Sequence, residues 1–127
     1  MPDRITEQAG AIVWRKGELL IVTTNAGGWS IPKGGIDAGE TTWEAAAREV
    51  LEEAGVEGEV DEKPFAVYEY GKFGGRYRVT VHLLKAKRVL DDWDEKEERE
   101  RRWITPGEID RAVSYANVAE LLKRVKV

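Results

Sequence analysis

A glycine-rich loop runs directly into an acidic helix in the stretch GGIDAGETTWEAAAREVLEEAGV, residues 34–56. Thr41 and Glu44 have the spacing of a capping box, which predicts where the helix begins. The alanines at 45–47 are strong helix formers, and Gly55 supplies the left-handed residue that commonly ends a helix. The stretch therefore predicts a helix that lies between Thr41 and Gly55.

The predicted helix gathers its acidic residues on one side. Since each helical residue turns about 100° around the axis, one side collects Trp43, Ala47, Val50, Leu51 and Ala54, and the other collects Glu49, Glu52 and Glu53. Like charges at this spacing repel, and the helix dipole disfavours anions in the last turns. Either Arg48 pairs with Glu52 on a solvated face, or the carboxylates bind a hard cation such as Mg²⁺, Mn²⁺ or Ca²⁺. The glycines at 34, 35 and 39 favour the cation, because they let the backbone turn tightly or approach a ligand.

The same stretch resembles the Nudix box at every defined position. Gly34 is followed after five residues by Glu40, and after seven more by the run Arg48-Glu49-Val50-x-Glu52-Glu53-x-Gly55-Val56. The resemblance implies a Nudix hydrolase, a metal-dependent enzyme that cleaves a diphosphate linked to another moiety. It also implies the Nudix fold, an α+β fold in which a mixed β-sheet lies between helical layers as an α/β/α sandwich.

The resemblance further implies roles for single residues. Glu49, Glu52 and Glu53, with the backbone carbonyl of Gly34, would hold the cation, which we expect to be Mg²⁺ with Mn²⁺ as the alternative. Glu40 and Arg48 would orient the loop and the helix for catalysis. Hydrolysis of a phosphoanhydride needs a positioned water and a base, and we take Glu52 as that base, although related enzymes assign the role differently among these glutamates. Crowded carboxylates have raised pKa values without metal, so activity is expected to rise toward alkaline pH.

Composition bounds the class of protein. The 127 residues are expected to form one domain, residues 1–127, around a single core. The absence of cysteine excludes a disulfide framework and a thiolate metal site, and it fits a reducing cytoplasm. No apolar run approaches a membrane span, and residues 1–8 lack the apolar segment of a signal peptide. Acidic residues outnumber basic ones by 24 to 20, which argues against general nucleic-acid binding, although a local basic rim could still hold phosphates. The partner that the Nudix resemblance implies is a small phosphoanhydride substrate.

Two strands are predicted before the box, Ala9 to Trp14 and Glu18 to Thr23, with a hairpin turn at Lys16-Gly17. The second is almost continuously apolar and β-branched, which is typical of a strand covered on both faces. Lys33 directly precedes the glycines that should approach the diphosphate. It is a candidate substrate-binding residue, and an ordinary exposed lysine is the alternative.

Two further strands follow the box, at Phe65 to Tyr70 and Arg76 to Leu84, joined by a turn over 71–75. In the second, apolar residues alternate with the polar row Arg76, Arg78, Thr80 and His82. Arginine binds phosphate bidentately, so Arg76 and Arg78 are candidate substrate contacts if this row lines the cleft and does not face solvent. We interpret His82, the sole histidine, as structural, because the box contains its own base.

The segment 91–102, DDWDEKEERERR, is a charge run that predicts a solvated loop. Nudix enzymes often bring one further carboxylate from such a loop, and Glu97, Glu98 and Glu100 are the candidates. Trp103-Ile104 predicts a short strand, and Thr105-Pro106 opens a short helix to about Val113. A last amphipathic helix is indicated by the spacing of Val118, Leu121, Leu122 and Val125.

The substrate is the least determined feature. The segments WSIPKGGI and VLDDWDEKEERERRWITPGEI resemble the diphosphoinositol polyphosphate phosphohydrolases and their diadenosine polyphosphate-cleaving relatives. The inositol-phosphate enzymes carry basic residues on the first strand, where this chain has Thr6-Glu7-Gln8, so a diadenosine polyphosphate is the preferred expectation. The alternatives are an inositol pyrophosphate, a house-cleaning activity on nucleoside triphosphates, and a catalytically silent nucleotide-binding module.

Overall fold

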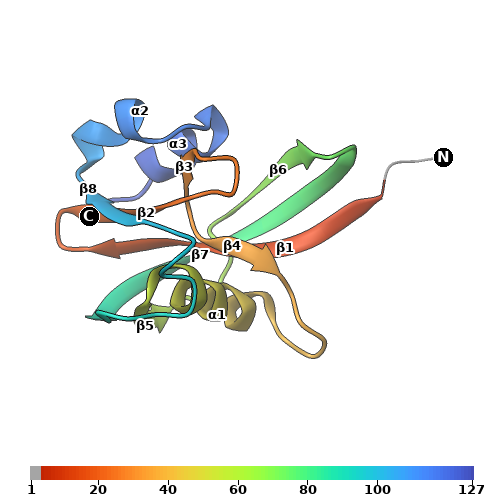
Figure 1. Ribbon diagram of the computed structural model, residues 1–127, viewed down its shortest axis with the longest axis horizontal. Helices are drawn as coiled ribbons and strands as arrows, with labels where there is room; N and C mark the ends of the chain where they lie inside the picture. Colours follow the sequence, from red (N-terminus) through yellow and green to blue (C-terminus); the bar gives the residue numbers. More distant parts are fainter. Residues whose placement is uncertain (1–3) are drawn as a thin grey trace.

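The computed structural model describes residues 4–127 of the protein. Its elements, in chain order, are β1 (Ile5–Arg15), β2 (Glu18–Thr23), β3 (Trp29–Ser30), β4 (Lys33–Gly35), α1 (Thr42–Ala54), β5 (Val56–Val60), β6 (Ala66–Lys72), β7 (Gly75–Val89), β8 (Arg101–Ile104), the 3₁₀ turn η1 (Pro106–Glu108), α2 (Ile109–Ala112) and α3 (Ala116–Lys123). Figure 1 shows α1 on one side of the strands and α2 and α3 on the other. The predicted α/β/α arrangement is confirmed.

The sheet is built around the parallel pair β1 and β7. These two strands are in register from Ile5 opposite Arg76 to Trp14 opposite Lys85. The main path runs β3-β2-β1-β7-β5, while β4 pairs with β1, β6 with β7 and β8 with β2. All of those other pairings are antiparallel, so the sheet is mixed, as expected.

Each face of the sheet carries its own apolar core. The face under α1 buries small side chains of β1 against the alanines of the helix, and the opposite face packs against α2 and α3. Strand β2 contributes to both, since Leu20 and Val22 face α1 whereas Leu19 and Ile21 face the other core. The prediction that β2 is covered on both sides is therefore confirmed. Within residues 4–127, no helix is long and apolar enough to span a membrane.

Sequence periodicity located the strands better than it located their ends. Strand β2 has the predicted bounds, whereas β1 and β7 extend beyond the predicted Ala9–Trp14 and Arg76–Leu84. The short strands β3, β4 and β5 were not predicted, because glycines or alternating glutamates weaken their local signal. The helical turn at Pro106 and the final helix are present, although α3 ends at Lys123 and Val125 packs against the core from beyond it.

The predicted division of helix α1 into an apolar and an acidic side is partly wrong. The buried side consists of Ala45, Ala46, Glu49, Val50, Glu53 and Ala54, while Leu51 is 37% exposed. The helix is rotated so that two of its three acidic side chains turn inward. This orientation follows from the loop strand β4, which pairs with β1 beside the helix and offers only glycine at the point of contact.

Candidate active site

Local sequence sets both ends of helix α1. The Thr41 hydroxyl accepts a hydrogen bond from the Glu44 amide at 3.2 Å, and the Glu44 carboxylate accepts one from the Thr41 amide at 2.9 Å. The predicted capping box is thus present. Gly55 has φ 65°, in the left-handed region, and its amide donates to the Leu51 carbonyl at 3.0 Å. These two caps fix where the acidic residues of the helix lie along its axis.

Gly34 places the backbone of β4 directly against the Glu49 side chain. A Cβ atom built at Gly34 would overlap all three atoms of the Glu49 carboxylate. Gly34 pairs with Ala9 of β1 and therefore cannot move away without breaking the sheet. Residue 34 is glycine because the acidic side chain fills the space that any other side chain would need.

Arg48 ties the loop to the helix. Its Nε and Nη2 atoms each donate to one oxygen of the Glu40 carboxylate at 2.8 Å, and Nη2 also donates to the Gly35 carbonyl at 2.8 Å. Such bidentate pairs are strong and directional. Arg48 holds the pKa of Glu40 down to about 2, with help from the Asp37 amide. Arg48 thus joins the helix to Glu40 and Gly35 of the preceding loop, and the catalytic role expected of Glu40 and Arg48 stays a prediction.

Glu49 and Glu53 form a buried acidic pair. Their exposed fractions are 8% and 5%. Burial is the main reason that the pKa of Glu53 rises to about 8; the Arg99 guanidinium opposes this rise, and the nearby Glu49 adds to it. Burial raises the pKa of Glu49 in the same direction. Two carboxyls held together away from water cannot both ionise at low cost unless a cation joins them.

The chemistry of this pair fits a hard divalent cation, which prefers oxygen ligands. Glu52 differs from the pair in exposure, since its side chain is 35% exposed. Arg48 Nη1 donates both to Glu52 at 3.1 Å and to Glu49 at 3.2 Å. Among residues 4–127, no three acidic or histidine side chains already converge as a metal-ligand set. Glu49 and Glu53 are therefore the core of the candidate site, and Glu52 would join them by leaving Arg48.

The charge run contributes an acid that was not among the predicted candidates. Glu97, Glu98 and Glu100 are exposed. Glu95 is half-buried, its amide donates to the Glu52 carbonyl at 2.9 Å, and its carboxylate accepts from Arg99 Nε at 2.8 Å. The same Arg99 Nε lies 3.9 Å from Glu53. Glu95 and Arg99 thus complete the charged surroundings of the acidic pair. Nothing in the local sequence distinguishes these two residues from the other charged residues of segment 91–102.

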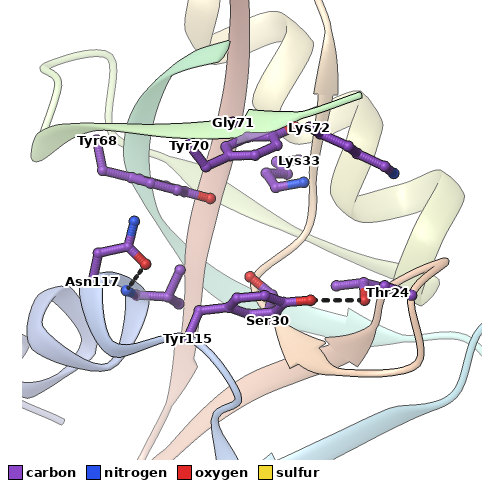
Figure 2. A pocket seen from close by; sticks show the side chains of 11 residues that line it. Thr24, Ser30, Lys33, Tyr68, Tyr70, Gly71, Lys72, Tyr115 and Asn117 are labelled. Atoms are coloured by element: carbon purple, nitrogen blue, oxygen red, sulfur yellow. Dashed lines mark hydrogen bonds between the residues drawn. The ribbon is translucent and has the colours of Figure 1, made fainter. Parts of the chain in front are cut away.

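A cavity of about 300 Å³ lies on the α3 side of the sheet. Figure 2 shows Tyr68 and Tyr70 of β6 along one wall and Tyr115 and Asn117 along the opposite wall. The cavity adjoins the acidic pair through Lys33, which lines it. Burial lowers the pKa of the Lys33 ammonium, and Glu53 opposes that shift.

Lys33 is therefore not an ordinary exposed lysine. Its Nζ lies 4.6 Å from the centre of the Tyr70 ring, in cation–π contact. It stands between the aromatic cavity and the acidic pair. The aromatic walls were missed from the sequence: the spacing of Tyr68 and Tyr70 places them on one face of a strand, but nothing links that face to Tyr115.

The structure does not bring Arg76 and Arg78 to this cavity. Arg78 donates to Glu7 of β1 at 2.9 Å, and Arg76 donates to Glu69 of β6 at 2.6 Å. Neither lines the cavity. They alternate along β7 with Tyr77 and Val79 and so lie on the α1 side of the sheet, opposite the tyrosine walls.

His82 is fully buried on that same side. Its ring nitrogens lie 2.7 Å from the Thr42 hydroxyl and 2.8 Å from the Asp61 carbonyl. It joins the start of helix α1 to the loop before β6. These contacts fit the structural interpretation of this residue, and the expectation that the polar row lines a cleft does not hold for it.

Comparison with known proteins agrees with this geometry. The NUDIX domain family matches residues 5–125. The chain belongs to the Nudix family. Similar curated proteins include Nudix hydrolase 12, mitochondrial, of Arabidopsis thaliana, which is 37% identical over 115 residues that cover 84% of this chain and 57% of the relative. Diphosphoinositol polyphosphate phosphohydrolase 2 of Rattus norvegicus is 30% identical over 116 residues, 87% of this chain and 63% of the relative.

The fold is likewise that of solved Nudix structures. A binary complex of the C. elegans Ap4A hydrolase superposes with a TM-score of 0.74 at 24% identity, covering 94% of this chain and 93% of that one. The chain spans about half the length of the first curated Nudix relatives that it matches. The curated relatives that are named for a substrate include a diphosphoinositol polyphosphate phosphohydrolase and an RNA pyrophosphohydrolase, so these likenesses show the family and leave the substrate open.

Proposed function

We propose that this Nudix chain hydrolyses a phosphoanhydride bond in a nucleoside diphosphate derivative, in a reaction that depends on Mg²⁺, with Mn²⁺ as a substitute. The observation that carries the proposal is the buried Glu49–Glu53 pair, pressed against Gly34 and adjoined by Lys33. A pair of buried carboxyls is costly unless it binds a cation. Family membership supports a hydrolase that uses a divalent metal.

We assign the roles of the three glutamates from how far each is exposed to solvent. Glu49 and Glu53, with the Gly34 carbonyl, would hold the cation. When bound, the cation supplies charge neutralisation at the phosphoryl oxygens and makes a nearby water more acidic. Glu52 is the best placed base, because it is the exposed member of the three and can accept a proton from a water that approaches from solvent.

Two positively charged side chains, Arg48 and Lys33, would assist the reaction without accepting or donating the proton. Arg48 holds the loop and Glu52 in place through its contacts with Glu40 and Gly35. Lys33 would pair with the phosphate chain of the substrate, since it faces the cavity beside Glu53. A further carboxylate near the metal was expected from Glu97, Glu98 or Glu100, and we propose Glu95 for that role instead.

The surroundings favour a dinucleoside polyphosphate, with diadenosine polyphosphate as the preferred compound, over an inositol pyrophosphate. The cavity has two charged lining residues, Lys33 and Lys72, and its walls are largely aromatic. Arg76 and Arg78 are engaged by Glu69 and Glu7. An inositol ring covered with phosphates would need more free positive charge than this. We further propose that the protein acts in the cytoplasm on a small molecule.

A substrate panel tests the proposal. Diadenosine polyphosphates, nucleotide sugars, nucleoside triphosphates and inositol pyrophosphates are compared by kcat/KM at one Mg²⁺ concentration and one ionic strength. We expect the diadenosine compounds to be cleaved best, and Glu53→Gln to abolish that activity while Glu97→Gln, an exposed glutamate of the loop, retains it. Absence of turnover on every compound, with either metal, would contradict the proposed activity. A preference for the inositol compound would contradict the substrate assignment alone.

A further inference from the structure

The C-terminal end of helix α1 is capped by the segment between β7 and β8, which runs past that end on its way to β8 (Figure 1). The last turn of the helix, Leu-Glu-Glu-Ala, contains no basic residue. The Glu95 amide donates to the Glu52 carbonyl at 2.9 Å, and Arg101 Nη1 donates to the Ala54 carbonyl at 2.8 Å. Free carbonyls at the end of a helix need such donors, and a cation there is favourable. The loop 91–100 is therefore bound to the helix that carries the acidic pair.

Trp93 is the side chain that packs this loop onto the helix. Its ring lies so close to Gly55 that a Cβ atom added there would come within 3.0 Å of three Trp93 side-chain atoms. The Arg101 guanidinium lies over the same ring, 4.0 Å from its centre, in a favourable cation–π contact. Gly55 is thus constrained twice, by its left-handed φ of 65° and by the space that Trp93 occupies.

The contact is made by the ring of Trp93 and not by its indole N–H. Nε1 is buried and has no hydrogen-bond partner among residues 4–127. A phenyl ring can therefore make similar stacking contacts without giving up a hydrogen bond. Trp93→Phe keeps an aromatic ring at this position, whereas Trp93→Ala removes the ring altogether.

The packing of Trp93 has a consequence two residues further along the chain. The Glu95 carboxylate accepts from Arg99 Nε at 2.8 Å. Arg99 Nε also lies 3.9 Å from Glu53, and Arg99 Nη1 donates to the Thr23 carbonyl of β2 at 2.8 Å. The loop is thus anchored at two points, on the end of helix α1 and on β2, with Glu95 held between them near the acidic pair.

We propose that Trp93 is a positioning residue of the acidic site, which holds Glu95 where its carboxylate joins Glu49 and Glu53 in binding the cation. The inference rests on the proposed function, because it takes these carboxylates to be the metal site. It goes further by assigning a residue that touches neither the cation nor the substrate. Without the ring, the loop keeps its anchor on β2 and loses its packing on the helix, so Glu95 is no longer held beside Glu53.

A double-mutant cycle on metal binding tests this role. Isothermal titration calorimetry without substrate measures the Kd for Mn²⁺ of wild type, Trp93→Ala, Glu95→Gln and the double variant. We expect each single variant to bind Mn²⁺ about tenfold more weakly than wild type, as is usual for residues that support a metal site. The double variant should bind no more weakly than the weaker single one, because both changes remove the same interaction. Independent effects would instead multiply to about 100-fold.

Two further variants separate positioning from stability. Trp93→Phe keeps a ring on Gly55 and should bind Mn²⁺ within about threefold of wild type. The matched control is Trp103→Ala, which also removes an indole beneath an arginine, since Arg15 lies 3.8 Å from the centre of the Trp103 ring. Trp103 packs against the core under α1, so its loss should lower the Tm but leave the Kd for Mn²⁺ within about threefold. Trp93→Leu, which is apolar but not planar, replaces Trp93→Ala in the cycle if the alanine variant does not fold.

Three results would overturn the positioning role. These are an unchanged Kd for Mn²⁺ in either single variant, multiplying effects in the double variant, and a loss in Trp103→Ala as large as that in Trp93→Ala. If wild type nevertheless hydrolyses a nucleoside diphosphate derivative, only this inference fails. If the cycle shows the expected coupling but wild type cleaves no phosphoanhydride with either metal, the positioning role stands and the proposed function fails.

Discussion

The carboxylate of Glu49 occupies the space that a side chain at Gly34 would need. The neighbouring Gly35 is different, because a Cβ atom there would meet nothing within 4 Å. Neither glycine has a positive φ, so the two positions differ in space and not in backbone strain. A comparison of Gly34 with Gly35 can therefore show whether the site needs space for the Glu49 side chain or only a flexible loop.

Replacing Gly34 by alanine should displace Glu49 and disable the site. Because misplacement of a catalytic group by about 1 Å costs on the order of 100-fold in rate, we expect kcat/KM to fall by about that factor in Gly34→Ala. Gly35→Ala should remain within about threefold of wild type, a barrier change under about 0.7 kcal/mol. Steady-state kinetics over a range of Mg²⁺ concentrations measures both. Equal losses in the two variants would show that loop flexibility, not space for Glu49, is what matters.

Glu53→Gln should keep the fold and abolish most turnover. The amide preserves the volume of the side chain but removes a charged ligand from the buried pair, so the barrier should rise by about 3 kcal/mol or more, at least two orders of magnitude in rate. The rate is measured at saturating Mg²⁺. Glu97→Gln changes the same group on the exposed part of the loop and serves as the control. A Glu53→Gln protein with a near wild-type rate would refute the assignment.

Divalent cations should stabilise the folded protein through the acidic pair. A ligand that binds only the native state raises the free energy of unfolding in proportion to the logarithm of its concentration over Kd. Mg²⁺ or Mn²⁺ should therefore raise the Tm of wild type, and it should raise the Tm of the double variant Glu49→Gln/Glu53→Gln far less. The Tm is measured by calorimetry with and without the divalent metal ion. The metal concentration is about 10 mM, which is about 100 times a Kd of about 0.1 mM. The same Tm shift in both proteins would place the bound cation elsewhere.

Without metal, stability should fall as pH rises through the titration of Glu53. Its pKa is raised from 4.5 to about 8 in the folded protein, mainly by burial, with Arg99 opposing the shift and Glu49 adding to it. The protonated form is favoured by folding, so this contribution is complete below about pH 4.5 and is lost as pH approaches 8. Glu40, whose pKa is about 2 because of Arg48, titrates below this window.

The measurement is the Tm in EDTA between pH 5 and 8.5. We expect a decline in wild type that corresponds to a few kcal/mol at most, and a much flatter profile in Glu53→Gln. Saturating Mg²⁺ should flatten the wild-type profile as well, because the cation favours the ionised carboxylates. Activity should rise with pH across the same range. A decline of equal size in wild type and Glu53→Gln would assign the titration to another group.

Lys33 should matter more to the substrate than Arg78 does. Lys33 lines the cavity beside Glu53, whereas Arg78 is paired with Glu7 on the other side of the sheet. Lys33→Met should lower kcat/KM by about tenfold to 100-fold, and more for a long polyphosphate than for a nucleotide sugar, with added salt narrowing that gap. Arg78→Met should stay within about threefold, under about 0.7 kcal/mol. The opposite ranking would restore Arg78 as a phosphate contact.

The ends of helix α1 and the spacing of its charged residues could be predicted from short segments of the sequence. The capping box at Thr41 and the left-handed Gly55 set the ends of helix α1, and both were readable because each depends on neighbours within one turn of chain. The spacing of Arg48, Glu49, Glu52 and Glu53 was also readable, as was the alternation that marks β7. These features follow from backbone geometry, which every short segment carries in its own sequence.

Contacts between distant segments decided the rest. Which side of α1 is buried depended on β4, whose Gly34 leaves room for the Glu49 side chain. Arg78 lies away from the tyrosine-walled cavity and donates to Glu7, 71 residues away in the chain, because the parallel pairing of β1 with β7 sets the two side by side. Tyr115 meets Thr24 across 91 residues to close the cavity. Strand pairing and register determine such neighbours, and no periodicity within a single segment encodes the register between two strands.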